Sequence, residues 1–261
     1  MNFIVCIKQV PATTDVKIDS QTNTLKREGV EAIVNPFDNY AIEESLMLKE
    51  RIGGKVTVLT MGPPQAEKAL REAISMGVDE GVLLSDRAFA GADTLATSYT
   101  LSQAIKKVGR FDLILCGKQA IDGDTAQVGP GIAEKLGIPH IAYVRKIEEI
   151  KPGYIRVERM MEDGFDILES TLPALITVVK EINIPRMPSL RGMMASKRAT
   201  IPVWNAQAIE ADPNKIGLTG SPTWVYKVFS PPPRGGGEVI TGDPAEQARK
   251  LVAKLREMKV I

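Results

Sequence analysis

Residues 112–136 read DLILCGKQAIDGDTAQVGPGIAEKL, an apolar run followed by a polar, glycine-rich loop and a segment with helical periodicity. We expect a strand over Asp112–Cys116 and a helix over Thr125–Leu136. A buried strand that leads through a short loop into a helix is typical of strand–helix–strand units. This stretch therefore predicts an α/β architecture built on a parallel sheet.

The same alternation extends over roughly the first 140 residues. The expected strands are Phe3–Ile7, Val56–Met61, Gly81–Leu84, Asp112–Cys116 and Ile141–Val144. Between them lie segments with helical spacing, and Gly53, Gly77, Gly109 and Gly137 stand where those helices should end. Asn35-Pro36 places a capping side chain before a proline at a helix start. The pattern predicts a mostly parallel, open, Rossmann-like sheet with helices on both faces.

After about residue 145 the pattern changes. Strand-like alternation covers Val144–Ile150, Ile155–Met161 and Ile167–Val179, and Val16–Val30 looks like an inserted hairpin. From Ile184 the chain is rich in Pro, Arg and Met, and Gly217–Gly242 holds three consecutive prolines and three consecutive glycines. That composition does not suit a packed core. We expect an α/β domain over 1–183 and, over 184–261, an extended arm that docks on a partner and ends in a helix, Pro244–Met258.

Composition excludes several classes of protein. Lys plus Arg number 33 against 32 for Asp plus Glu, which argues against a nucleic-acid or membrane-surface protein. No apolar run approaches the roughly 20 residues that cross a bilayer, and the N-terminus reads as a first strand rather than a signal peptide. Cys6 and Cys116 sit in apolar runs, as reduced core residues of a cytoplasmic protein do. The single histidine, His140, argues against a histidine metal site or a catalytic triad, and we expect no metal and no catalytic side chain.

Ligands of open parallel sheets bind beyond the carboxyl ends of the strands, beside helix N-termini. Four loops qualify here, at residues 6–11, 60–64, 91–94 and 117–125. None carries the G-x-G-x-x-G fingerprint or a P-loop lysine. The sequence therefore predicts a nucleotide site of another kind, or none.

The fourth loop has more small and polar groups than a helix start needs. Thr125, Gln127 and the amides near Val128 and Gly129 are candidates to cradle a diphosphate, whereas Asp122 and Asp124 suit ribose hydroxyls or loop bracing because like charges repel. Simpler interpretations stay open elsewhere: a strand-to-helix turn at Met61–Pro63, an N-cap at Asp93, capping at Asn35–Asp38, and a core residue and a strand-end charge at Cys6 and Lys8.

At this loop the chain resembles a known family. Gly117–Asp122 (GKQAID) is similar to the signature of electron transfer flavoprotein β subunits, as are Val5–Val10 (VCIKQV), Asn35–Asp38 (NPFD), Met61–Pro63 (MGP) and the closing Leu251–Leu255. The resemblance covers nearly the whole chain. It implies a heterodimer in which the β subunit's arm wraps around an α subunit. Ordinary members bind AMP in β and one FAD in α.

Three segments depart from the ordinary members. Asp122–Pro130, Gly91–Thr94 and Gly220–Thr223 resemble the electron-bifurcating branch. In that branch the β site holds a second FAD, and NADH is the substrate that docks beside it. The resemblance then implies electron flow from NADH to ferredoxin or flavodoxin and, through the FAD in α, to an acyl-CoA dehydrogenase or a similar flavoenzyme.

The resemblance also assigns binding residues. Those in the nucleotide-binding motifs are Cys6, Lys8, Asn35, Asp38, Met61, Gly117, Asp122, Gly123, Asp124, Thr125, Ala126, Gln127, Val128, Gly129, Pro130 and Ala133. Those expected nearer the flavin and NADH are Gly62, Pro63, Gly91, Ala92, Asp93 and Thr94.

Pro185–Arg198 resembles the loop that touches the dehydrogenase, with Leu190 as its apolar anchor; the alternative is an arm that only packs on α. Two other functions remain open: an ordinary carrier with AMP in β, and an adenine-nucleotide-binding regulatory protein, against which the long arm argues.

Overall fold

The computed structural model describes residues 1–12, 18–19, 24–25, 31–227 and 235–261. They form two compact units, Met1–Tyr226 and Lys227–Ile261.

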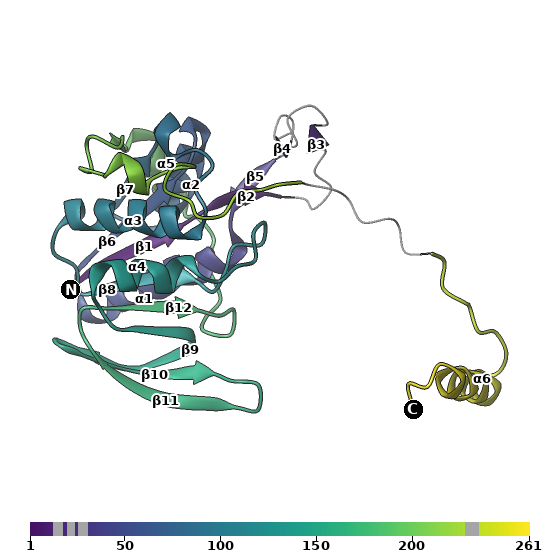
Figure 1. Ribbon diagram of the computed structural model, residues 1–261. Helices are drawn as coiled ribbons and strands as arrows, with labels where there is room; N and C mark the ends of the chain where they lie inside the picture. The colour runs from purple at the N-terminus through teal and green to yellow at the C-terminus, as the bar shows by residue number, and fades with distance from the viewer. Residues whose placement is uncertain (13–17, 20–23, 26–30, 228–234) are drawn as a thin grey trace. The chain divides into compact units, whose positions relative to one another are not determined.

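A nine-stranded sheet forms the first unit (Figure 1). Its strands are β1 (Asn2–Ile7), β6 (Lys55–Met61), β7 (Glu80–Leu84), β8 (Leu113–Gly117), β9 (His140–Lys151), β10 (Tyr154–Met160), β11 (Phe165–Thr171), β12 (Ala174–Val178) and β13 (Val203–Trp204). Seven of them run parallel, in the order β9-β12-β8-β1-β6-β7-β13, and β10 and β11 add antiparallel strands beside β9. The prediction of a mostly parallel open sheet is confirmed.

Helices cover both faces of the sheet, as predicted. α1 (Pro36–Ile52) and α2 (Glu67–Met76) pack on the face that holds Val5 and Leu115. α3 (Thr94–Val108) and α4 (Val128–Leu136) pack on the opposite face, with Ile4 and Ile114. All four helices end at the predicted glycines. α4 begins at Val128 rather than at the expected Thr125, so residues 125–127 belong to the loop.

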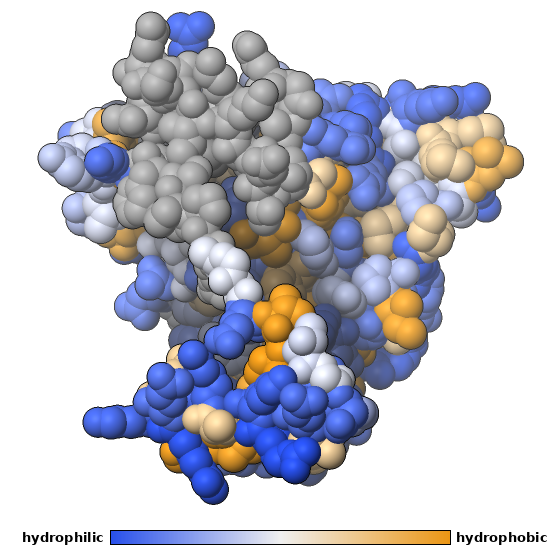
Figure 2. Space-filling view, turned by 90° about the vertical axis from the view of Figure 1, so that its right-hand side faces the viewer, coloured by the Kyte–Doolittle hydropathy of each residue, from blue (hydrophilic) through white to orange (hydrophobic). Residues whose placement is uncertain are grey.

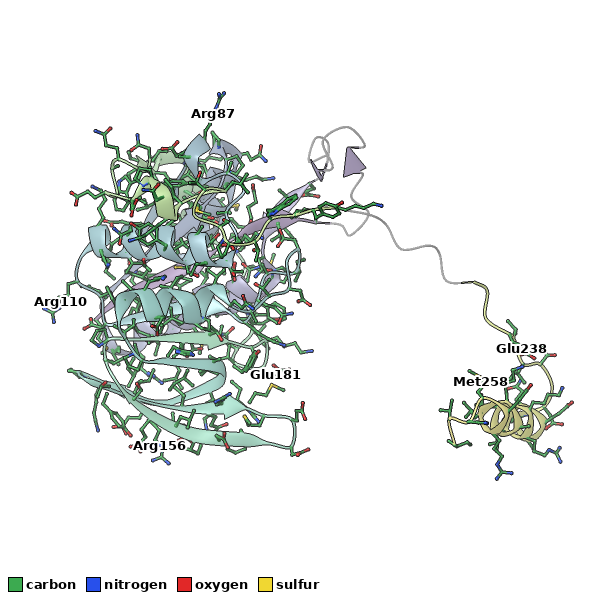
Figure 3. All side chains as sticks on the ribbon, viewed as in Figure 1. Arg87, Arg110, Arg156, Glu181, Glu238 and Met258 are labelled. Carbon is green, nitrogen blue, oxygen red and sulfur yellow. The ribbon has the colours of Figure 1, made fainter. Side chains whose placement is uncertain are left out.

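The later strands differ in detail from the prediction. β9 is continuous through Val144, whereas Ile167–Val179 splits into β11 and β12 at Pro173, which has no N–H for a ladder. Along β10, Ile155 and Val157 are buried while Arg156 points outward (Figure 3), which is the predicted alternation.

Short elements complete the first unit. They are β2 (Gln9–Pro11), β3 (Ile18–Asp19), β4 (Thr24–Leu25), β5 (Ala32–Val34) and the 3-10 turns η1 (Pro64–Ala66), η2 (Arg87–Phe89) and η3 (Pro213–Lys215). β3 and β4 pair antiparallel, as a hairpin in Val16–Val30 requires. The turn expected at Gln21–Asn23 lies outside the described residues.

The first part of the expected arm folds onto the first unit. α5 (Leu190–Arg198) packs on α2, where the Arg71 guanidinium donates to the Ser196 carbonyl. The Arg186 guanidinium pairs with Glu43 at 2.9 Å, and β13 extends the sheet beside β7. This compact unit therefore ends at Tyr226, beyond the expected domain limit at residue 183.

The second unit contains α6 (Pro244–Glu257), close to the predicted Pro244–Met258. Asp243 caps the helix by accepting from the Glu246 N–H. No residue of α6 is buried, and Leu251 and Val252 are exposed; Figure 2 shows hydrophobic residues beside hydrophilic ones on this surface. Among all the described helices, none is long and apolar enough to cross a membrane.

Two buried polar residues tie the start of α1 to the sheet. Asn35 was expected to cap α1, but its side chain makes no cap hydrogen bond. Instead its amide donates to Asp38 and to the Gln119 carbonyl, both at 2.9 Å, and its oxygen accepts from the Ile121 N–H at 3.1 Å. The Asp38 carboxyl also accepts from the Lys8 N–H at 2.7 Å. The loops after β1 and β8 are thereby joined to one helix start.

The burial of Asp38 has an electrostatic consequence. The residue is 5% exposed, and this burial raises its pKa to about 7, although hydrogen bonds from Asn35, Lys8 and Gly117 lower it. Between about pH 4 and pH 7 the folded chain therefore binds more protons than the unfolded chain. The contribution of Asp38 to stability is present below that window and is lost as the pH rises through it, by up to about 1.4 kcal/mol per pH unit.

Asp38→Asn removes this titration. We expect the variant to be less stable than the wild type at pH 5, because one buried N–H loses its acceptor, and we expect the difference to shrink by pH 8 as the wild type loses stability. Urea unfolding at several pH values measures both free energies. Asp163→Asn, in an exposed turn, serves as the control and should follow the wild type. If the difference in unfolding free energy between the wild type and Asp38→Asn stays constant with pH, the raised pKa of Asp38 is contradicted.

Candidate functional site

A cavity of about 870 Å³ opens at the carboxyl ends of β1, β6 and β8. From β1 the chain continues to β6 on one side, whereas β8 lies on the other, so this is the point at which the strand order reverses. Open α/β sheets bind ligands at such points. The volume lies within the roughly 300–1,000 Å³ of small-molecule sites.

The structure brings most of the predicted site residues together around this cavity. Those that line it are Cys6, Lys8, Asp38, Met61, Gly62, Pro63, Gly91, Ala92, Asp93, Thr94, Gly117 and all residues from Asp122 to Gly129. Four predicted residues lie elsewhere. Asn35 is buried behind the loops, Pro130 and Ala133 are within α4, and Leu190 begins α5.

Other lining residues were not identified from the sequence. Phe89 and Leu101 supply apolar surface, Gln65 and Ala66 follow β6, and Val225 comes from the segment assigned to the arm. Phe89 and Leu101 have the sequence character of ordinary core residues, and Val225 lies far along the chain from the other loops. None of these three residues carries a local sequence signal of binding.

Backbone geometry leaves free N–H donors at the loop before α4. Asp124 and Ala126 have φ of 53° and 54°, and Gln127 follows in the right-handed region. Such a left–right succession turns successive N–H groups toward one side. Within the described residues, the N–H groups of Val128 and Gly129 donate no hydrogen bond, as expected of a helix N-terminus. These free donors lie in residues that line the cavity, where a phosphate would find them.

The loop acids are bound to other side chains. Lys8 Nζ lies 2.6 Å from Asp122 Oδ1 and bridges the end of β1 to the loop. Asp124 accepts a hydrogen bond from the Gln119 amide. This agrees with the interpretation that the two carboxylates brace the loop, and the Lys8 ammonium offsets the charge that would repel a phosphate.

The glycines of this region serve different purposes. A Cβ on Gly117 would collide with Asp38, and one on Gly129 would lie 2.7 Å from Thr177 Cγ2. Those two glycines allow α1 and α4 to approach the sheet. A Cβ on Gly123 would meet nothing within 4 Å, so that position borders open space.

The opposite wall is built around Asp93. Its carboxylate accepts from the Leu95 and Ala96 N–H groups, which confirms the N-cap interpretation. It also accepts from the Thr223 N–H at 3.2 Å and the Thr223 hydroxyl at 2.8 Å, so Pro222, Thr223 and Val225 become part of the wall. Thr94 Oγ1 bonds Gln127 Oε1 at 3.1 Å and joins the two helix starts.

The floor of the cavity holds Cys6 and Cys116. Both are free and buried, as expected of reduced core cysteines. The described residues contain no group of three or more His, Cys, Asp or Glu side chains able to hold a metal ion. Free amides for phosphates, open space at Gly123 and apolar surface at Phe89 and Leu101 together fit a nucleotide coenzyme with a flat ring system.

Comparisons with known proteins identify the family of this chain. The family model described as "Electron transfer flavoprotein domain" matches residues 22–209. The chain is 52% identical to "Electron transfer flavoprotein subunit beta" of Thermoanaerobacterium thermosaccharolyticum over 100% of both chains. It is also 52% identical, over 100% of both chains, to "Caffeyl-CoA reductase-Etf complex subunit CarD" of Acetobacterium woodii. "Protein FixA" of Azotobacter vinelandii is 48% identical over 98% of this chain and 94% of its own.

A match of this extent, along the same strands and loops that enclose the cavity, is a family relationship. The chain belongs to the electron transfer flavoprotein family, among its β subunits.

Proposed function

We propose that this chain holds FAD in the cavity at the carboxyl ends of β1, β6 and β8. With an α subunit that carries a second FAD, it takes electrons from NADH and divides them between two acceptors. One acceptor is ferredoxin or flavodoxin, and the other is an acyl-CoA dehydrogenase-type enzyme. The observation that carries the proposal is the loop of free backbone donors beside open space at Gly123.

The residues of the cavity have separate roles in this proposal. The N–H groups of Val128 and Gly129, with the side chains of Thr125 and Gln127, bind the diphosphate. Lys8 keeps Asp122 neutralised beside it. Gly91–Thr94, on the opposite wall, lie nearer the flavin ring and NADH.

The bound coenzyme supplies the one- and two-electron redox chemistry. The chain's own residues bind it, orient it and exclude water from the floor, where Cys6, Cys116 and Leu101 are buried. We assign no acid, base or nucleophile to the cavity, in keeping with an electron carrier.

Two surfaces are assigned to partners. Leu190 is 72% exposed at the start of α5, close in sequence to the exposed Ile184 and Met187, and forms the contact with the dehydrogenase. The exposed apolar residues of α6 form a contact with the α subunit. One relative is named as a subunit of a caffeyl-CoA reductase–Etf complex, which supports a terminal partner that acts on a CoA thioester. We place the complex in the cytoplasm, where free thiols such as these persist.

Cofactor content tests the proposal directly. The purified heterodimer should release about two FAD and no AMP on denaturation, measured by chromatography against protein concentration. One FAD plus one AMP would instead identify an ordinary carrier. A colourless chain that binds adenine nucleotides without a partner would identify a regulatory protein.

Gly123→Phe tests the position of the coenzyme. The ring would occupy the open space beside the phosphate loop, so FAD in this subunit should be lost while the FAD of the α subunit stays. Flavin absorbance per heterodimer should fall by about half. Glu134→Phe, on the exposed side of the α4 helix that follows this loop, is the matched control and should keep full flavin content. Full content in Gly123→Phe would contradict this placement.

Leu190→Asp tests the dehydrogenase contact. A charge in place of an exposed apolar anchor should slow electron delivery to the dehydrogenase by about tenfold or more, because a desolvated charge at an interface costs several kcal/mol. Reduction of the heterodimer by NADH should be unchanged. Leu190→Met keeps an apolar side chain and should behave as the wild type. Equal delivery by the wild type and Leu190→Asp would leave α5 as a packing segment only.

A further inference from the structure

The chain has two cysteines, and the fold places them side by side. Cys6 on β1 and Cys116 on β8 are register partners in adjacent parallel strands. Strands in a sheet are about 4.8 Å apart, and register partners point to the same face. Both side chains belong to the core cluster on the α3 and α4 face, and both line the cavity.

The register of the two strands brings the thiols together: Cys6 and Cys116 project from the same face of adjacent strands. The pKa of the Cys116 thiol is raised well above its usual value, first by the neighbouring Cys6 and then by burial. The pair is therefore a dithiol set by backbone register rather than by side-chain flexibility.

Their neighbours offer no third ligand. In the same row of the sheet, Thr177 on β12 is paired with Cys116, and Leu59 on β6 is paired with Cys6. The described residues provide no cluster of three metal-binding side chains. The site suits a soft centre that forms two bonds to sulfur and brings its own third substituent.

We propose that Cys6 and Cys116 form a dithiol binding site for a trivalent organoarsenical, R–As=O. Two As–S bonds form, the As=O bond breaks, and the two thiol protons leave with the oxygen as water, giving R–As(S–Cys)₂. Arsenic remains trivalent, so the step needs no oxidant or reductant. The adduct lies on the cavity floor. We expect it to exclude the coenzyme, and this second expectation rests on the proposed function.

Phenylarsine oxide and the full chain test the dithiol site. Native mass spectrometry should detect one adduct per chain, which 2,3-dimercaptopropanol removes and a monothiol does not. Because the chain has no other cysteine, Cys6→Ala and Cys116→Ala should each abolish the adduct. The native chain should bind about a hundredfold more tightly than the same chain in urea, where the thiols are no longer neighbours and the second bond loses its high effective concentration.

Three results would overturn the site: no adduct on the native chain, an adduct retained by either single-cysteine variant, or equal affinity in urea. The affinities of the native and the urea-unfolded wild-type chain are compared without any substitution. This comparison therefore still decides the question if a cysteine variant fails to fold.

The flavin-loaded and flavin-free heterodimers test the competition. The adduct should form at least about tenfold more slowly in the loaded complex, because bound coenzyme covers the floor. Pretreated chain should also fail to take up FAD. Equal rates in the two complexes would overturn the competition. A heterodimer with no nucleotide in this subunit would contradict the proposed function, whereas the adduct on the full chain would still support the dithiol.

Discussion

The geometry of the cavity depends on one buried polar pair, Asn35 and Asp38. Between them they accept from the Lys8 and Ile121 N–H groups and donate to the Gln119 carbonyl. These three hydrogen bonds are partly buried, so the roughly 1–3 kcal/mol cost of an unpaired interior group is an upper bound for each. The pair therefore fixes the end of β1 and the loop after β8 relative to the start of α1. The loop with free N–H donors and the two buried cysteines lie at those two strand ends, so the pair positions both.

Much of the fold could be predicted because its signals are local. Runs such as Phe3–Ile7 are apolar on both faces, which is typical of a strand covered by helices on both sides. Glycine at Gly53 or Gly137 ends a helix by its own backbone preference, whatever the rest of the chain does. The cavity was predictable to the same extent, because loops at the carboxyl ends of parallel strands meet at one edge.

What the sequence did not predict depends on contacts between distant residues. α4 begins three residues late because Asp124 and Ala126 adopt left-handed conformations, which no side-chain periodicity signals. Asn35 is a residue type that commonly caps helices. Its side-chain amide instead makes hydrogen bonds to Gln119 and Ile121, more than 80 positions away in the sequence. Thr223 joins the cavity wall through Asp93, 130 positions away, and Arg186 is held by Glu43 across 143. Proline and glycine content alone predicted an arm over residues 184–261 and could not reveal these attachments.

The proposed contact between α6 and the α subunit has a thermodynamic consequence for assembly. The helix is 14 residues long, carries no buried side chain, and is close to the shortest length at which a helix holds together in water without tertiary packing. We therefore expect α6 to become fully helical only when it binds the α subunit. Titration calorimetry of the two subunits should then show a larger decrease in heat capacity than the docking of two rigid surfaces would produce. The reason is that apolar burial and helix formation would occur in the same binding step. Assembly would be weaker per unit of area buried, and correspondingly easier to reverse.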